Sequence, residues 1–323
     1  MTASLANACY LIATVLFILG LKGLTHPRTA VRGNLLSALG MLVAVATALV
    51  SEVGLHWGYI LAGVLIGSLI GAWLSISIKM TAMPQLVALF NGFGGGASLL
   101  VVAVSLHPSN LTASPSLSLQ SSVAAAAAAI VGTVTLTGSL VAFAKLQRLL
   151  RRPLVIKGQR TVNAICAFLL LAAAVLLAYA PPNPMALWAV AGLAALLGLL
   201  LVLPIGGADM PVVIAALNSY SGLAACGTGF ILNNTVLIVS GSLVGASGMI
   251  LTRIMCRAMN RSFRKGPYRC RGYLRRQNQV DLGRGNCHAA GIGPPGRHRA
   301  RIWNGGFPGP ACRPGFIQPI GDP

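Results

Sequence analysis

Charged side chains are scarce in this sequence. Of its 323 residues only 9% are Asp, Glu, Lys or Arg, and four are acidic, whereas 55% are hydrophobic and the mean hydropathy is +0.78. Soluble globular domains carry about 25% charged residues. A soluble two-domain protein is therefore excluded, and the chain is predicted to be an all-α membrane protein that lies in a lipid bilayer.

Paired cysteines are also lacking. The seven cysteines are an odd number, none forms a CxxC pair, and four of them lie inside apolar runs: Cys9, Cys166, Cys226 and Cys256. Disulfide frameworks and zinc sites need paired or clustered cysteines, so we expect neither, and no metal. No basic leader with a small-residue cleavage site precedes the first apolar run, which is therefore predicted to be a retained helix.

Long apolar runs, in contrast, are abundant. A spanning helix needs about 20 mainly apolar residues. Nine stretches meet this length, at 5–22, 33–51, 56–78, 83–106, 122–144, 161–180, 185–204, 210–232 and 235–257. We therefore predict a bundle of nine transmembrane helices, and because nine is odd, its two ends lie on opposite sides of the membrane.

The basic residues predict how this bundle is oriented. All thirteen Lys and Arg residues among the first 262 fall in connectors one, three and five or at the end of span nine, and the connectors of the other side hold none. Basic loops are the cytoplasmic ones. The N-terminus is accordingly predicted outside and the end of span nine in the cytoplasm, with Asp209 on the cytoplasmic side and Glu52 outside.

Two pairs of spans repeat each other. The fourth span begins MPQLVALFNGFGG (83–95) and the eighth begins MPVVIAALNSYSG (210–222), while the spans that follow contain TGSLV (137–141) and SGSLV (240–244). Both hairpins run in the same direction, so the repeat is parallel and related by an axis along the membrane normal. In the third span Gly63, Gly67 and Gly71 are predicted to let a neighbouring backbone approach closely.

Two asparagines occupy matching places in this repeat. Seven residues beyond each proline, Asn91 and Asn218 lie on the order of 10 Å into a hydrocarbon core of about 30 Å. An amide at that depth needs a hydrogen-bond partner. The candidates are the other asparagine and the hydroxyls of Ser139, Ser242, Ser219, Tyr220 and Ser221. Asp209, directly before the second Met-Pro pair, is predicted to cap the eighth span.

These polar groups fit two interpretations. They are either contacts between helices, worth about 1 kcal/mol each, or the lining of a hydrated path. Ionisable residues normally mark such a path, yet no His, Asp, Glu, Lys or Arg is predicted deep within a span. Protons would then cross through water held by Asn, Ser and Thr, or with a titratable group contributed by another chain.

Four longer motifs resemble a known family. They are MPQLVALFNGFGG (83–95), TGSLVAFAKL (137–146), GGADMPVV (206–213) with LNSYSG (217–222), and IMCRAMNRS (254–262). Together they resemble the β subunit of proton-translocating NAD(P)+ transhydrogenase, over about residues 1–262. The resemblance implies a subunit of a bacterial inner-membrane complex that passes hydride from NADH to NADP+ and couples this transfer to proton movement.

The resemblance also implies partners and roles for single residues. The partner is an NAD(H)-binding α subunit, and αβ units form a homo-oligomer, so NAD(H) and NADP(H) belong to the complete complex and none is bound by this chain. The proton path maps onto Asn91, Ser139 and Asn218, with no catalytic residue in this chain. Coupling to the nucleotide domain maps onto Asp209, Arg257 and Arg261. Because the position of Asn91 holds histidine in some members, we expect the partner to supply the titratable group.

The sequence changes character after residue 262. Of residues 263–323, 20 are Gly or Pro, 11 are Lys or Arg and two are acidic, a composition that predicts disorder. The family continues instead into an NADP(H)-binding domain. We therefore interpret this tail as the product of a frameshift or a truncation of the β subunit. A basic arm for anionic lipid is an alternative. Nucleic acid is not an expected partner, because the tail lacks interleaved aromatic residues.

Two other functions remain open at this stage. A stand-alone secondary transporter would explain the parallel repeat and the spans interrupted by Pro and Gly. A purely structural membrane scaffold would explain the amides and hydroxyls as packing contacts. A transhydrogenase membrane subunit acts only with a partner, whereas a transporter would move a substrate alone. Residues 1–262 form the membrane domain in each case.

Overall fold

The computed structural model describes residues 3–51, 56–107, 119–150, 158–179 and 184–259. All of the described residues lie within Met1–Arg269. The predicted tail at 263–323 therefore lies outside the described residues.

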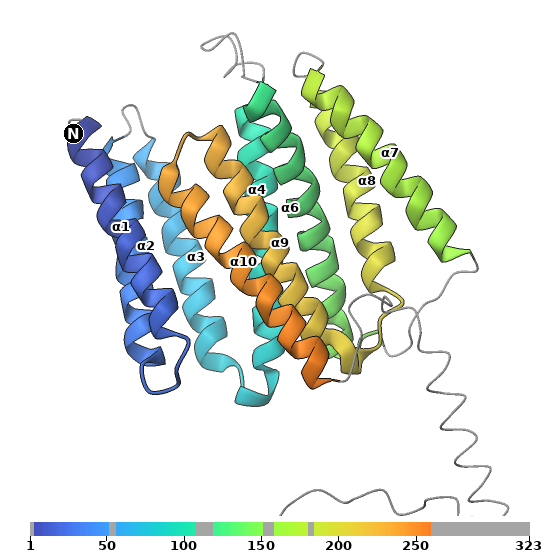
Figure 1. The fold of residues 1–323 in the computed structure, drawn as a ribbon, viewed down its shortest axis with the longest axis horizontal. Helices are drawn as coiled ribbons and strands as arrows, with labels where there is room; N and C mark the ends of the chain where they lie inside the picture. Colours follow the sequence, from blue (N-terminus) through green and yellow to red (C-terminus); the bar gives the residue numbers. More distant parts are fainter. Residues whose placement is uncertain (1–2, 52–55, 108–118, 151–157, 180–183, 260–323) are drawn as a thin grey trace, which may run out of the picture. The chain divides into compact units, whose positions relative to one another are not determined.

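Helices make up the described part of the chain (Figure 1). Nine of them are long and apolar enough to cross a membrane, and their ends lie within three residues of the predicted spans. They are α1 (Ala3–Gly23), α2 (Ala30–Ser51), α3 (Trp57–Ser77), α4 (Met83–Ser105), α6 (Leu119–Leu146), α7 (Gln159–Tyr179), α8 (Pro184–Val202), α9 (Met210–Ile231) and α10 (Thr235–Ala258). Short 3-10 turns, η1 (Met80–Ala82) and η2 (Gly207–Asp209), precede α4 and α9. The predicted all-α membrane fold is confirmed.

Helix α6 lies at the centre of the packing. It contacts α4, α7, α8 and α9. In its most apolar 18-residue stretch 61% of the residues are buried, the largest share among the nine spans. Its alanine run packs against α4, α7 and α8 in one apolar cluster that includes Ala129, Val102, Leu170 and Val190. Small side chains in a central helix allow several neighbours to approach, because dispersion contacts require close packing.

Glycines allow the two helices within each repeated hairpin to approach closely. A Cβ atom added at Gly95 of α4 would lie 2.6 Å from the carbonyl oxygen of Gly132 in α6, and one added at Gly222 of α9 would lie 2.5 Å from the backbone nitrogen of Gly245 in α10. Such distances are shorter than van der Waals contact, so any larger residue would force the helices apart. Gly95 and Gly222 hold matching positions of the repeat, so the first helix of each hairpin uses a glycine for its close contact.

Helix α3 behaves differently from the prediction. None of its residues is buried, and no atom lies within 4 Å of a Cβ added at Gly63, Gly67 or Gly71. The expectation that this stripe admits a neighbouring backbone is wrong for the described residues of this chain, because α3 has no extensive contact with another described helix.

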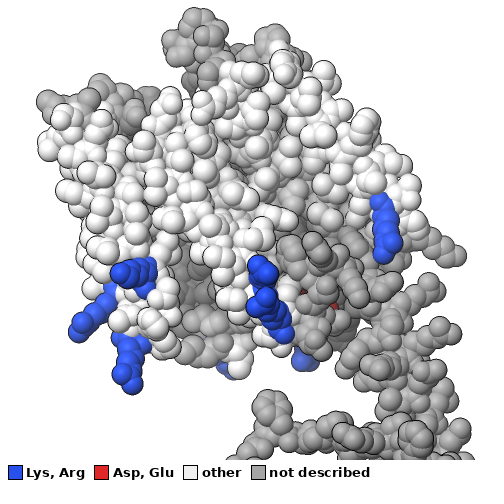
Figure 2. Space-filling view, in the orientation of Figure 1, with Lys and Arg blue, Asp and Glu red and all other residues white. Residues whose placement is uncertain are grey.

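Basic side chains gather at one end of the helices (Figure 2). We call this the basic end of the bundle. The described members of the predicted set all lie near the C-terminal ends of α1, α3, α6 and α10, near the N-terminal ends of α2 and α7, or in the connectors at those ends: Lys22, Arg28, Arg32, Lys79, Lys145, Arg148, Arg160, Arg253 and Arg257. The other four, Arg151, Arg152, Lys157 and Arg261, lie outside the described residues. The predicted clustering of basic connectors thus holds for the residues that can be placed.

The glycine contact between α4 and α6 can be tested by adding one methyl group. We expect Gly95→Ala to lower the free energy of unfolding of the purified chain by about 1–3 kcal/mol, because overpacking displaces backbone atoms. Titration with a denaturing detergent, followed by circular dichroism, measures this change. Gly192→Ala in α8 is the control, since nothing lies within 4 Å of its added Cβ. Equal stability of the two variants would contradict the close contact.

Candidate functional site

Asn91 and Ser139 form a buried polar pair between α4 and α6. The Asn91 Nδ2 atom donates a hydrogen bond of 3.1 Å to the Ser139 hydroxyl oxygen, and the two residues are 8% and 1% exposed. Asn91 follows the start of α4 by eight residues and Ser139 precedes the end of α6 by seven. Both therefore lie about 10–12 Å from the basic end. Of the candidate partners for the two asparagines, Ser139 is the one that binds Asn91.

The other hydroxyls of this part of α6 have local partners. Thr133 donates to the carbonyl oxygen of Ala129, and Thr135 donates to that of Val131, at 2.7 Å each. A hydroxyl that bonds to its own helix is satisfied without a neighbour. Ser139 differs from these threonines because its oxygen accepts a bond from another helix, so it is the α6 hydroxyl best placed to line a polar site.

Asn218 of α9 does not repeat this arrangement. Its amide is half-buried and has no hydrogen-bond partner among the described residues. The adjacent Ser219 is 1% exposed and donates to the carbonyl oxygen of Gly245 at 2.6 Å. Ser242, the counterpart of Ser139, is exposed and donates to Val239 in its own helix. The repeat therefore suggested a partner for Asn218 that the fold does not provide.

The length of the connecting turn accounts for this difference. Helices α9 and α10 are joined by residues 232–234, whereas α4 and α6 are joined by the longer segment 106–118. Ser219 packs against Gly245 and Gly248, so Ser242 lies one to two helical turns away from the level of Asn218. A short turn restricts how one antiparallel helix can slide along the other, and the two hairpins consequently differ in register.

Asp209 lies at the basic end, where η2 leads into α9. It is half-buried and occupies the residue before α9, but its side chain makes no capping hydrogen bond. The predicted N-cap is therefore wrong. Capping residues usually have extended backbone, whereas Asp209 closes a 3-10 turn with φ −92° and ψ 0°.

Of the two predicted coupling arginines, one can be placed. Arg257 is exposed in the last turn of α10, where a positive charge is favoured by the helix dipole. Arg261 lies outside the described residues. Asp209 and Arg257 thus share the basic end but belong to different helices.

Lys145 is a polar residue whose burial the sequence did not predict. It was assigned to a basic connector, yet it is 6% exposed and its ammonium donates to carbonyl oxygens of Val202, Leu203 and Ile205 at the end of α8. The signal that could have identified it is its place six residues after Ser139, inside the motif TGSLVAFAKL. The last carbonyl groups of a helix lack hydrogen-bond donors within that helix. Lys145 provides such donors at the end of α8.

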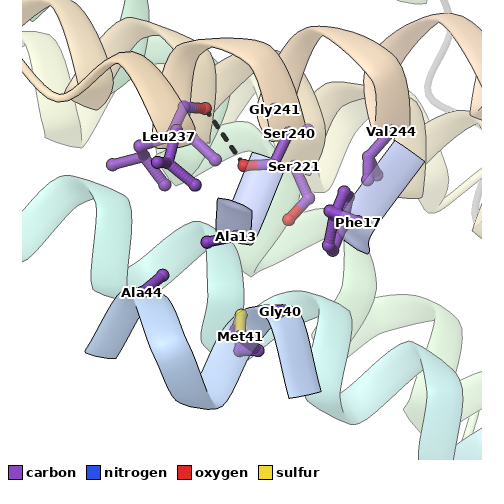
Figure 3. A pocket seen from close by; sticks show the side chains of 13 residues that line it. Ala13, Phe17, Gly40, Met41, Ala44, Ser221, Leu237, Ser240, Gly241 and Val244 are labelled. Carbon is purple, nitrogen blue, oxygen red and sulfur yellow. Dashed lines mark hydrogen bonds between the residues drawn. The ribbon is translucent and has the colours of Figure 1, made fainter. Parts of the chain in front are cut away.

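A cavity of about 230 Å³ is lined by the α1–α2 hairpin and the α9–α10 hairpin. Figure 3 shows Phe17 and Met41 on one side and Ser221 and Ser240 on the other. Ser240 donates a long bond of 3.4 Å to Leu237. The lining is mainly apolar and carries no ionisable side chain. Within the described ranges no three His, Cys, Asp or Glu residues converge as a metal site would require.

Comparison with known proteins places these features in a family. Residues 6–266 match the family model described as NAD(P) transhydrogenase beta subunit. Two curated sequences of NAD(P) transhydrogenase subunit beta from Rhodospirillum rubrum are each 44% identical to the chain over 266 residues. The aligned region covers 81% of this chain and 57% of each relative. The chain therefore spans a little over half the length of the curated relatives it matches.

The bond between Asn91 and Ser139 can be measured by a double-mutant cycle. We expect Asn91→Leu and Ser139→Ala to be coupled by about 0.5–1.5 kcal/mol in the free energy of unfolding, the range for polar contacts between membrane helices. Detergent-induced unfolding of the four proteins gives this coupling. The matched cycle of Asn91→Leu with Thr137→Ala should be additive, because Thr137 bonds to its own helix. Additivity in both cycles would exclude the contact.

Proposed function

Because this chain belongs to the family of NAD(P) transhydrogenase β subunits, we propose that residues 1–262 are the proton-translocating membrane part of that enzyme complex. The complex moves hydride between NADH and NADP+ and couples the transfer to proton movement across a bacterial inner membrane. This chain contributes the path for the proton, and other parts of the complex carry the nucleotides.

One observation carries the proposal: the buried amide and hydroxyl of Asn91 and Ser139 lie at the same depth between two packed helices. Neither group titrates near neutral pH. Each can, however, donate and accept hydrogen bonds. Together they can therefore hold and orient water at a depth in the membrane where lipid chains offer no hydrogen-bonding groups. A chain of such waters conducts protons when a titratable group starts or ends it.

Asn218 supports a role for the α subunit. An amide exposed to hydrocarbon without a partner is unfavourable by several kcal/mol. Because the described residues offer it no partner, a helix of the α subunit that covers α9 would satisfy this amide. The same helix would supply the titratable group that α4, α6 and α9 lack at this depth. The functional unit is then αβ, and we propose that it forms a homo-oligomer.

The described residues do not fit a nucleotide. They form no β-strand that could precede a phosphate-binding turn. The glycines at 92–96 lie inside α4, where Gly92 and Gly95 pack against α6. We assign NAD(H) and NADP(H) to the complete complex. Asp209, Arg257 and Arg261 are proposed to couple the membrane domain to the nucleotide domain at the basic end.

A first experiment tests Asn218 in a complex reconstituted from this chain, the α subunit and an NADP(H)-binding domain. We expect Asn218→Leu to slow hydride-coupled proton uptake into liposomes roughly 5- to 30-fold, the factor for a lost hydrogen bond of about 1–2 kcal/mol in the barrier. Ser242→Ala is the control, because Ser242 is exposed and bonds to its own helix. A scaffold role would leave proton uptake unchanged in both variants.

Orientation is tested separately. In a variant without the seven native cysteines, Lys79→Cys is expected to react with a membrane-impermeant maleimide only after the cells are permeabilised, since the positive-inside rule places the basic end in the cytoplasm. His56→Cys, at the opposite end of α3, should react in intact cells. The reverse labelling pattern would refute the proposed orientation.

A further inference from the structure

The ammonium group of Lys145 is held by three backbone oxygens. It donates to the carbonyl oxygen of Val202 at 2.9 Å, to that of Ile205 at 2.6 Å, and to that of Leu203. All three acceptors come from the end of α8 and the residues directly after it, while Lys145 itself lies in the last turn of α6. One side chain therefore joins the ends of two helices.

These contacts match the number of donors on an ammonium group. An ammonium has three N–H donors, and each of them has an acceptor here. A neutral amine would leave one carbonyl oxygen without a donor in a site that is only 6% exposed. The negative end of the α8 dipole favours the positive charge as well. Lys145 thus offers one N–H donor for each of the three carbonyl oxygens around it.

Neighbouring residues reinforce this junction. Gln85 at the start of α4 donates to the carbonyl oxygen of Leu146 at 3.1 Å, and Gln159 at the start of α7 donates to that of Leu200 at 2.8 Å. Each bond supplies a donor to a carbonyl near the end of α6 or α8. Four helices are joined at the basic end by side chains that bind these backbone oxygens.

The segment that Lys145 holds leads directly to Asp209. It continues through Gly206 and η2 into α9, whose first residue, Met210, is fully buried in an apolar cluster with Val202 and Ile205. Ser139 precedes Lys145 by six residues on the same helix, about 9 Å along its axis. Lys145 therefore links the helix that carries the Asn91–Ser139 pair to the segment that carries Asp209.

We propose that Lys145 is a positioning residue, which holds the α8–α9 connection in place and so sets where the Asp209 carboxylate lies relative to the Asn91–Ser139 pair. What Asp209 does at that position rests on the proposed function. The hold on the connection itself does not, because it follows from the contacts of Lys145 alone. The two parts can therefore be tested apart.

Hydrogen–deuterium exchange tests the hold on the connection. In the full chain in lipid nanodiscs, Lys145→Met should speed exchange of the amides at 203–209 about tenfold or more, the factor that corresponds to a lost charged hydrogen bond. Lys145→Gln keeps two donors and should show a smaller increase. Lys79→Met is the control, since it removes one exposed basic residue from the same end. Exchange at 203–209 that is equal in all four proteins would overturn the proposal.

A double-mutant cycle tests whether Lys145 acts through Asp209. In the reconstituted complex, Lys145→Met should reduce hydride-coupled proton uptake about tenfold, the effect of ~1.4 kcal/mol in the barrier, and should add little to the loss caused by Asp209→Asn. Losses that multiply would show that Lys145 has only a general structural role and would overturn the positioning of Asp209.

Failure of this inference and failure of the proposed function give different results. If exchange changes in Lys145→Met while proton uptake does not, the positioning of Asp209 is wrong, and the Asn218→Leu result still decides the proton path. If Lys145→Met does not accumulate in membranes, Lys145→Gln carries both measurements, and a normal exchange pattern in it would count against the hold on the connection.

Discussion

Polar groups of this protein that lie inside the bilayer must find hydrogen-bond partners within protein or trapped water. Hydrocarbon offers no donors or acceptors, so an unsatisfied amide or carbonyl there is unfavourable by several kcal/mol. The buried bond between Asn91 and Ser139 and the three bonds of Lys145 both follow from this constraint. It also accounts for the threonines of α6, whose hydroxyls donate to their own helix.

The same constraint implies that the side-chain amide of Asn218 needs a hydrogen-bond partner. The first helix of each repeated hairpin uses a glycine at the matching position to approach the second helix closely, yet only the first hairpin satisfies its asparagine within the described chain. The second hairpin has a shorter turn, so its serine lies at another level and bonds locally. A repeat with one satisfied and one unsatisfied amide is what a subunit needs if a partner helix completes the path.

The basic end has a different character from the middle of the bundle. Charged side chains are concentrated there (Figure 2), and amide and ammonium donors bind the last carbonyls of α6 and α8. Asp209 lies in the connection that these donors hold in place. The nucleotides are proposed to bind on this side of the membrane helices. A rigid junction there would allow a conformational change at the nucleotides to be transmitted to the membrane helices, and the reverse.

Much of the fold could be read from local properties of the sequence. Nine apolar runs predicted, to within three residues, the nine spanning helices of the described part of the chain, and four motifs identified the family. A run of about 20 apolar residues determines a spanning helix by itself, because length and hydropathy do not depend on distant residues. The Asn91–Ser139 pair could be anticipated for the related reason that both lie at similar depth.

Contacts that depend on rotation and register were decided by the tertiary structure. Lys145 counts as a loop charge in any sequence window, and only the position of α8 beside α6 buries it. The capping role expected for Asp209 failed because its backbone closes a 3-10 turn. The stripe on α3 has the spacing of a helix contact but meets no described neighbour. Composition therefore determined which segments cross the membrane, whereas glycine contacts and turn lengths determined which polar groups meet, because those depend on how helices slide and rotate against each other.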